Sequence, residues 1–126
     1  MNLTFIEIRV ENFSFMKSSG IEKNAFDFGF SPRFKEGDAK DFIVSFEVKM
    51  EVFESQSVLE TEIFGIFETE AEISEDFKNS TFPKINAPAI AYPFVRAFLS
   101  NFLLSAGHTP IKLPSINFSS IVNKEK

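Results

Sequence analysis

The residues that could perform chemistry in this chain are few, and their spacing does not assemble a catalytic site. His108 is the single histidine and there is no cysteine, so neither a catalytic triad nor a Cys- or His-rich metal set can form. The acids between Glu68 and Asp76 lack the Asp-x-Asp-x-Asp-Gly spacing of a calcium loop, and the five scattered glycines form no phosphate-binding loop. We therefore expect no enzymatic activity, no cofactor and no metal.

Phenylalanine is the residue type that stands out. The chain has 18 Phe, no Trp and a single Tyr, Tyr92. Burying one Phe ring contributes about 1.5–3 kcal/mol, and a domain of this size has limited interior volume for so many rings. Some rings are therefore expected to line grooves or contacts between subunits. The alternative is that all of them lie in one ordinary core.

Charge and length narrow the class of protein. The formal net charge of −5 argues against a nucleic-acid partner, because affinity for the phosphate backbone requires clustered Lys and Arg. Glu7 and Glu11 lie where a secretory signal would need an unbroken apolar run, so we expect a cytoplasmic location. Residues 1–126 are expected to form a single domain.

Four stretches in the first half alternate between apolar and polar residues, which is typical of strands with one buried face. They cover residues 3–15, 26–31, 42–52 and 58–67. In the first stretch Ile6, Ile8 and Val10 share one face, whereas Phe13 and Phe15 fall on the other. This switch indicates either a β-bulge or a strand that is apolar on both faces at its far end.

Residues 87–105 predict one long helix whose only charged residue is Arg96. Its apolar side chains cover about half of the circumference, which implies a second packing surface besides one sheet. A membrane span competes by length, but Arg96, Asn101 and the internal Pro93 make it costly, so we expect no membrane insertion. A proline-bearing loop and a short helix capped by Asn117 follow. The predicted fold is α+β: a four-stranded antiparallel meander with one long helix and one short C-terminal helix on one face.

Two short segments of the C-terminal third carry a family resemblance. The first contains Ile90, Tyr92, Pro93, Phe94 and Arg96, and the second contains Ile116, Asn117 and Phe118. Together they resemble the segments that open the long helix and precede the last helix in the SecB family of export chaperones. Ser14 and Phe15 also fit, whereas Pro114 lies one residue further from Ile116 than the family pattern would place it.

The resemblance implies an ATP-independent chaperone that holds unfolded polypeptide in apolar grooves for protein export. It also implies a homotetramer, a dimer of dimers with the long helices sandwiched between two sheets. From the strand faces we expect the client-binding groove to contain Phe13, Phe15, Phe26, Phe28, Phe30 and Tyr92. The expected oligomer interface contains Phe94, Phe98, Leu99 and Phe102.

Acidic residues gather after residue 59, where no Lys or Arg occurs before Phe77. This run is either a solvated surface or a docking face for a basic partner, with Glu60, Glu62, Glu68 and Glu70 as candidates. The resemblance implies a SecA-type export motor as that partner. The sequence lacks the family's extended C-terminal tail and has Met16 where an acidic contact residue is common, so client holding is better supported than delivery to the motor.

Three alternatives stay open on the sequence. One is a dedicated SecB-like chaperone of a toxin–antitoxin pair, which would hold one client instead of many. Another is a small carrier whose Phe-rich face closes around an apolar ligand. A third concerns assembly, which could stop at a dimer.

Overall fold

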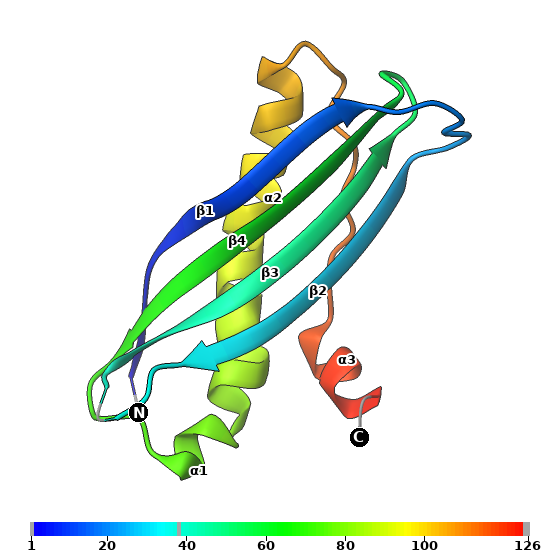
Figure 1. Cartoon of the computed structure of the whole chain (residues 1–126). Helices are drawn as coiled ribbons and strands as arrows, with labels where there is room; N and C mark the ends of the chain where they lie inside the picture. The colour runs from blue at the N-terminus through cyan, green and yellow to red at the C-terminus, as the bar shows by residue number, and fades with distance from the viewer. Residues whose placement is uncertain (1, 38, 125–126) are drawn as a thin grey trace.

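The computed structural model describes residues 2–37 and 39–124, which form one sheet layer and one helical layer (Figure 1). The antiparallel sheet contains β1 (Leu3–Lys17), β2 (Ala25–Phe34), β3 (Asp41–Val52) and β4 (Ser57–Thr69). The helical part contains α1 (Glu75–Lys78), the π-helical turn η1 (Phe82–Asn86), α2 (Ala87–Ser105) and α3 (Phe118–Lys124). The predicted fold class is confirmed, and α1 and η1 are short additions that the sequence did not predict.

The strand order is β1-β4-β3-β2, which corrects one detail of the predicted meander. Strands β2, β3 and β4 follow one another as a meander does, but β1 pairs with β4 and lies at the far edge from β2. The connection over residues 18–24 therefore crosses the ends of β4 and β3. Its seven residues reach about 23 Å when extended, and three strand spacings amount to about 14 Å.

A side-chain clip holds this crossover connection against the β3–β4 turn. The Ile21 amide donates to Oε1 of Gln56 at 3.1 Å, and Nε2 of Gln56 donates to the Ile21 carbonyl at 2.9 Å. The Ser18 amide also donates to the Gln56 carbonyl at 2.8 Å. Gln56 has a φ of 47°, a left-handed conformation that costs a non-glycine residue free energy and that these hydrogen bonds help to hold.

Two β-bulges explain the apolar switch in β1. The pairing with β4 skips Ile6 and Glu11. Each extra residue shifts the alternation by one, so Phe5, Ile8 and Phe13 all point to the same face. The bulge alternative is therefore the correct one, and it puts the aromatic residues at both ends of β1 over the helical layer.

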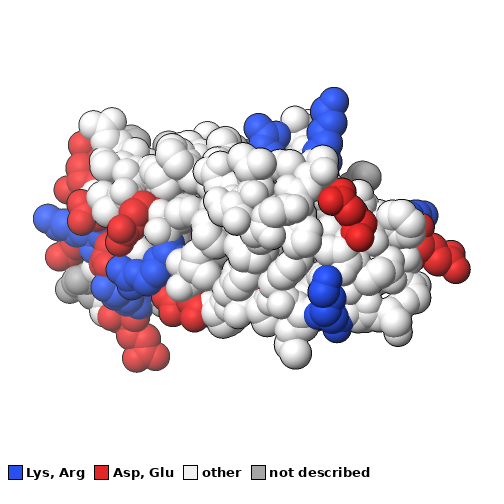
Figure 2. Space-filling model, turned by 90° about the horizontal axis from the view of Figure 1, so that it is seen from above, with Lys and Arg blue, Asp and Glu red and all other residues white. Residues whose placement is uncertain are grey.

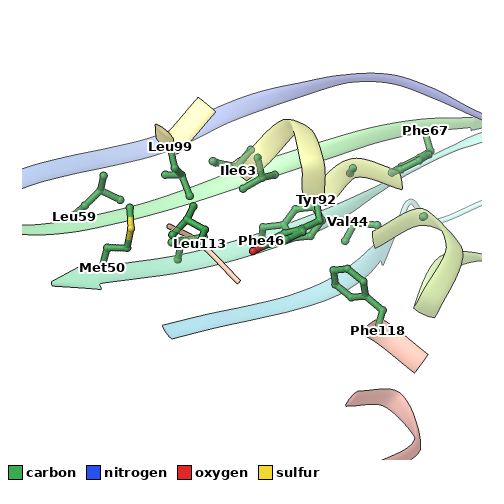
Figure 3. Packing of buried hydrophobic residues seen from close by; sticks show 14 of the residues in the cluster. Val44, Phe46, Met50, Leu59, Ile63, Phe67, Tyr92, Leu99, Leu113 and Phe118 are labelled. Atoms are coloured by element: carbon green, nitrogen blue, oxygen red, sulfur yellow. The ribbon is translucent and has the colours of Figure 1, made fainter. Parts of the chain in front are cut away.

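The core lies between the inner face of the sheet and one stripe of α2 (Figure 3). Strands β3 and β4 bury alternate residues completely, as expected for central strands with one wet face. From the sheet the core takes Phe42, Val44, Phe46, Met50, Leu59, Ile63 and Phe67, and from α2 it takes Ala91, Val95, Leu99 and Leu103.

The long helix ends in the hydrogen-bond pattern of a Schellman motif. The His108 amide donates to the Leu103 carbonyl at 2.9 Å and the Gly107 amide to the Leu104 carbonyl at 3.1 Å. Gly107 has a φ of 89°, which glycine adopts without strain. The predicted end of the helix is thus confirmed. The helical stretch 82–105 is long and apolar enough to span a membrane, but here its apolar stripe packs on the sheet.

The helix approaches the sheet most closely where Ala91 lies over Gly65. A Cβ atom added to Gly65 would come within 2.9 Å of the Ala91 Cβ, which is closer than two carbon atoms pack. We expect Gly65→Ala to lower the free energy of unfolding by about 1–3 kcal/mol, because α2 must move away from the core. Urea denaturation measures this effect.

The matched control is Gly29→Ala on β2, where an added Cβ meets no atom within 4 Å. Combining Gly65→Ala with Ala91→Gly should recover part of the loss, although glycine in the helix costs about 1 kcal/mol. Equal stabilities of Gly65→Ala and Gly29→Ala would contradict the close approach as a constraint.

Candidate functional site

A row of phenylalanines lines the inner face of the edge strand β2. Phe26, Phe28, Phe30 and Phe34 alternate along the strand, and each ring is half-buried. The centroids of neighbouring rings lie 6.1 Å apart for Phe26 and Phe28 and 5.8 Å apart for Phe28 and Phe30. Because β2 is an edge strand of the sheet that the described residues form, these rings keep apolar surface open along the sheet edge. We call these four residues the Phe row.

The last helix and Tyr92 back the Phe row on one side. The ring of Phe118 packs edge-on against Phe30 at 4.9 Å and against Tyr92 at 5.8 Å. Tyr92 also meets Phe28 at 5.3 Å. Phe118 is 3% exposed, and the sequence analysis, which used strand faces, missed it as a groove residue. Its matched position in the second resemblance segment was the available signal.

Tyr92 anchors the loop between α2 and α3 and does not line an open groove. Its side chain is 4% exposed, which corrects the predicted role. The hydroxyl donates to the Pro114 carbonyl at 2.7 Å. Burial raises the pKa of Tyr92, and the nearby Arg96 partly opposes this increase. Tyr92 therefore stays protonated and holds the loop and Phe118 in place beside the Phe row.

Phe13 and Phe15, also predicted for the groove, belong to a second aromatic cluster at the opposite edge of the sheet. Phe13 packs on Phe102 at 4.6 Å and on Phe98 at 6.0 Å. Phe15 meets Phe102 at 5.1 Å and His108 at 5.6 Å. The six predicted groove residues therefore do not form one surface, because β1 pairs with β4 and not with β2.

The predicted interface residues of α2 divide between core and surface. Leu99 is completely buried within the subunit, so its assignment to an oligomer interface is corrected. Phe94 is 50% exposed and stacks on Phe5 at 4.7 Å, while Phe98 and Phe102 are half-buried. Further exposed apolar residues, which the sequence analysis did not assign to an interface, lie on β1 and α2: Ile6, Val10, Ile90 and Leu104.

This side of the molecule has little charge. Viewed from above, where β1 and the end of α2 lie in Figure 1, a broad central stretch lacks charged side chains and the charges gather at its margins (Figure 2). We give the name β1 face to the exposed or half-buried apolar residues Ile6 and Val10 of β1 and Phe94, Phe98 and Phe102 of α2. Exposed apolar surface that lacks charge at its centre is typical of contacts between subunits.

The outer face of the sheet, away from α2, carries the acidic residues. Glu60 and Glu62 line a shallow depression of about 480 Å³ together with Asp27, Glu47 and one basic residue, Lys49. We call it the acidic depression, because four of its five charged residues are acidic. Glu62 accepts hydrogen bonds from Arg33 at 3.1 Å and Ser45 at 2.9 Å, so part of this charge is compensated within the subunit.

The other two predicted acidic residues lie elsewhere. Glu68 is six residues beyond Glu62 on β4, about 20 Å along the strand. Glu70 follows the strand and accepts a hydrogen bond from the Asn2 amide at 3.1 Å. The described residues contain no cluster of three or more His, Asp or Glu that could hold a metal ion.

Comparison with known proteins identifies the family to which this fold belongs. A family model described as preprotein translocase subunit SecB matches residues 12–126. The chain belongs to the SecB family. The resemblance seen in its C-terminal third is thereby confirmed and extends over nearly the whole sequence.

Two relatives share part of this sequence. An uncharacterized protein of Methanocaldococcus jannaschii is 29% identical over 94 residues, which make up 71% of this chain and 59% of that protein. The protein-export protein SecB of Anaplasma phagocytophilum is 38% identical over 63 residues, or 50% of this chain and 39% of that protein. The matched stretch is therefore less than two thirds of either relative.

Solved structures share the SecB fold. The SecB-like chaperone Rv1957 of Mycobacterium tuberculosis, in complex with a ChAD peptide from the HigA1 antitoxin, superposes with a TM-score of 0.69 at 12% identity, covering 90% of this chain and 87% of that chain. A protein of unknown function from Streptococcus agalactiae gives 0.54 at 14% identity, with 91% and 98% covered. At these identities the likeness establishes the fold.

The anchoring role of Tyr92 is testable. We expect Tyr92→Phe to lower the free energy of unfolding by about 1 kcal/mol, because the Pro114 carbonyl loses the hydroxyl that donates to it. Since the folded pKa of Tyr92 is raised, the stability that its protonated form provides is complete below the ordinary pKa of about 10 and is lost as the pH rises through the folded value.

Chemical denaturation across this pH range, with phenolate absorbance of the single tyrosine, measures both effects. Tyr92→Phe lacks the titrating group and is the control for the general alkaline loss of stability. A wild-type stability that falls no faster than that of Tyr92→Phe above the ordinary pKa would contradict a protonated anchor.

Proposed function

We propose that this SecB-family chain is an ATP-independent chaperone that holds unfolded polypeptide on the Phe row of β2. The observation that carries the proposal is a line of half-buried aromatic rings along an unpaired sheet edge, backed by Phe118 and Tyr92. Family membership supports it, and so does the fold shared with a SecB-like chaperone that was solved with a peptide. Phe13 and Phe15 are not part of this site.

The energetics suit a holding chaperone. A client aromatic side chain buried on the Phe row contributes about 2 kcal/mol, whereas micromolar affinity requires about 8 kcal/mol net of the cost of association. Several rings must therefore act together on one extended segment. Such binding selects for exposed apolar residues and not for a particular sequence, so it favours unfolded over folded proteins.

Subunit assembly is the second part of the proposal. The β1 face combines an edge strand with exposed apolar residues and little charge, and we propose that it pairs with another subunit. A dimer of dimers would place several Phe rows in one homotetramer, where a long client can occupy more than one at high effective concentration.

We consider two cellular roles for such a chaperone. A cytoplasmic chaperone for protein export would deliver clients to a SecA-type motor, and the acidic depression offers a surface for a basic segment of that motor. A dedicated chaperone of a toxin–antitoxin pair is the second candidate. It is supported by the likeness to Rv1957, whose bound peptide comes from an antitoxin. A carrier of an apolar ligand would need a closed pocket, whereas the Phe row is an open edge.

Removing rings from the Phe row tests client holding. We expect Phe26→Ser with Phe30→Ser to weaken binding of an unfolded, reduced client at least tenfold, because two apolar contacts are lost. Suppression of client aggregation and fluorescence anisotropy measure this loss. The matched control is Phe53→Ser in the β3–β4 turn, where the ring is 53% exposed and lies outside the Phe row.

Different results of this experiment would contradict different parts of the proposal. Absence of protection by the wild-type protein at equimolar oligomer would reject the proposal. Equal protection by the double variant and by Phe53→Ser would show that clients do not bind at β2. If the double variant unfolds by circular dichroism, Phe26→Ser alone provides the measurement, since Phe26 lies at the end of the Phe row.

A charge placed on the β1 face tests subunit assembly. We expect Phe94→Glu and Phe98→Glu each to reduce the oligomeric mass in solution, because an unpaired carboxylate in an apolar interface costs several kcal/mol. Light scattering after size exclusion gives the mass. Phe53→Glu, with similar exposure to Phe94, should keep the wild-type mass, and an unchanged oligomer in both α2 variants would exclude this face.

A further inference from the structure

Strand β2 offers its backbone as well as its rings, because it is an edge strand of the sheet that the described residues form. Pro32 indicates which backbone groups face the open edge. A proline inside an edge strand lies where its nitrogen points away from the neighbouring strand, since it has no N–H to donate. Phe28 and Phe30 occupy alternate positions along β2 together with Pro32, so their N–H and C=O groups also point away from β3. The Phe row therefore presents hydrogen-bonding groups with which an extended polypeptide can pair.

A segment paired with β2 would divide its side chains between the two faces of the sheet, because successive side chains of a strand point to opposite faces. Every second side chain would lie beside the Phe row, where neighbouring ring centroids are 6.1 and 5.8 Å apart. Residues two apart in an extended chain are separated by a similar distance, about 6.7 Å. The side chains between them would point to the outer face of the sheet.

The acidic depression on that outer face extends to the β2 edge. Asp27, Phe28 and Gly29 are part of its lining, so the depression and the Phe row share one strand. Gly29 lies directly opposite Glu47 of β3. An atom added at the Cβ position of Gly29 would have no neighbour within 4 Å, and Glu47 is exposed. The Glu47 carboxylate is therefore accessible from the open edge across Gly29.

Glu47 has a carboxylate and not a cation as its neighbour on the other side. It lies opposite Glu62 of β4, and like charges directly opposite each other in a sheet are destabilising. Glu62 forms an ion pair with Arg33 at 3.1 Å, whereas none of the ion pairs within the described residues includes Glu47. Lys49 lines the same depression but lies two residues further along β3, opposite Asp27. A cation that arrives from the β2 edge would relieve this repulsion.

The spacing of strands brings such a cation within reach. A residue paired beside Gly29 would be separated from Glu47 by two strand spacings, about 9.6 Å between backbones. The long side chain of a Lys or Arg and the Glu47 side chain point to the same face and together bridge this gap. Any other residue in place of Gly29 would put a side chain between them.

We propose that β2 accepts, as a fifth strand, an extended client segment in which apolar and basic residues alternate. The apolar side chains lie on the Phe row, and a basic side chain lies over Gly29 beside Glu47. This inference rests on the proposed function and names its substrate class. The site thereby selects for register as well as for apolar residues, because a shift by one residue would exchange the apolar and basic sides of the segment.

Three matched peptides test this inference by fluorescence anisotropy. The first alternates Phe with Lys, the second has the same composition with all Phe grouped before all Lys, and the third alternates Phe with Ser. We expect the first peptide to bind roughly tenfold tighter than the second, because some rings of the grouped peptide must face away from the Phe row. It should bind about threefold tighter than the third, and this smaller difference should shrink in high salt.

Variants at exposed positions locate the contacts. Glu47→Gln should remove most of the advantage of Lys over Ser in the alternating peptides. Gly29→Gln fills the open space on the outer face of β2 and should reduce the same advantage while leaving the affinity for the Phe/Ser peptide unchanged. The matched control is Glu68→Gln, which removes one negative charge outside the lining of the acidic depression and should retain the advantage.

Three results would overturn the inference. Equal affinities of the alternating and grouped Phe/Lys peptides would do so while leaving the proposed function intact, since both peptides still bind the Phe row. An advantage of Lys that Glu47→Gln and Glu68→Gln reduce equally would also do so, because a general attraction to the acidic protein would then explain it. Binding of none of the three peptides, together with no protection of an unfolded client, would reject the proposed function as well.

Discussion

One helix covers four strands only along a diagonal, and the distribution of apolar surface in this protein depends on that constraint. A helix with its side chains is about 10 Å wide, and adjacent strands are about 4.8 Å apart. The close approach of Ala91 to Gly65 fixes where α2 crosses β4. The central strands are buried along that line, while the inner faces of both edge strands keep aromatic rings that the helix does not fully cover.

The two edges have different surroundings, and this difference organises the proposed functions. At the β1 edge the rings interlock with the exposed side of α2, which produces a broad apolar face with charges at its margins. At the β2 edge the rings form a narrow row backed by α3 and Tyr92. A broad face suits a folded partner subunit, whereas a narrow row suits a single extended chain. The many Phe residues of the sequence are thus distributed over two surfaces, one at each edge of the sheet, and the core.

Much of the architecture could be predicted because local patterns determine it. The alternation of residues in 42–52 and the apolar stretch 87–105 placed β3 and α2 correctly, and the switch before Phe13 gave a bulge as one of two interpretations. The pairing of β1 with β4 could not be predicted, because alternation defines the faces of a strand but not its neighbours. For the same reason the predicted groove joined rings from opposite edges. Leu99 was misassigned because a helix with a wide apolar surface does not reveal which part meets its own sheet.

The Gln56 clip has a mechanical consequence for the sheet. Strands β1 and β2 are joined by one short connection, and its midpoint is hydrogen-bonded to the β3–β4 turn. Tension applied to β2 is borne at that corner by the central hairpin before it reaches β1. The β1 edge is thereby mechanically separated from the β2 edge, although the two strands are consecutive in the sequence.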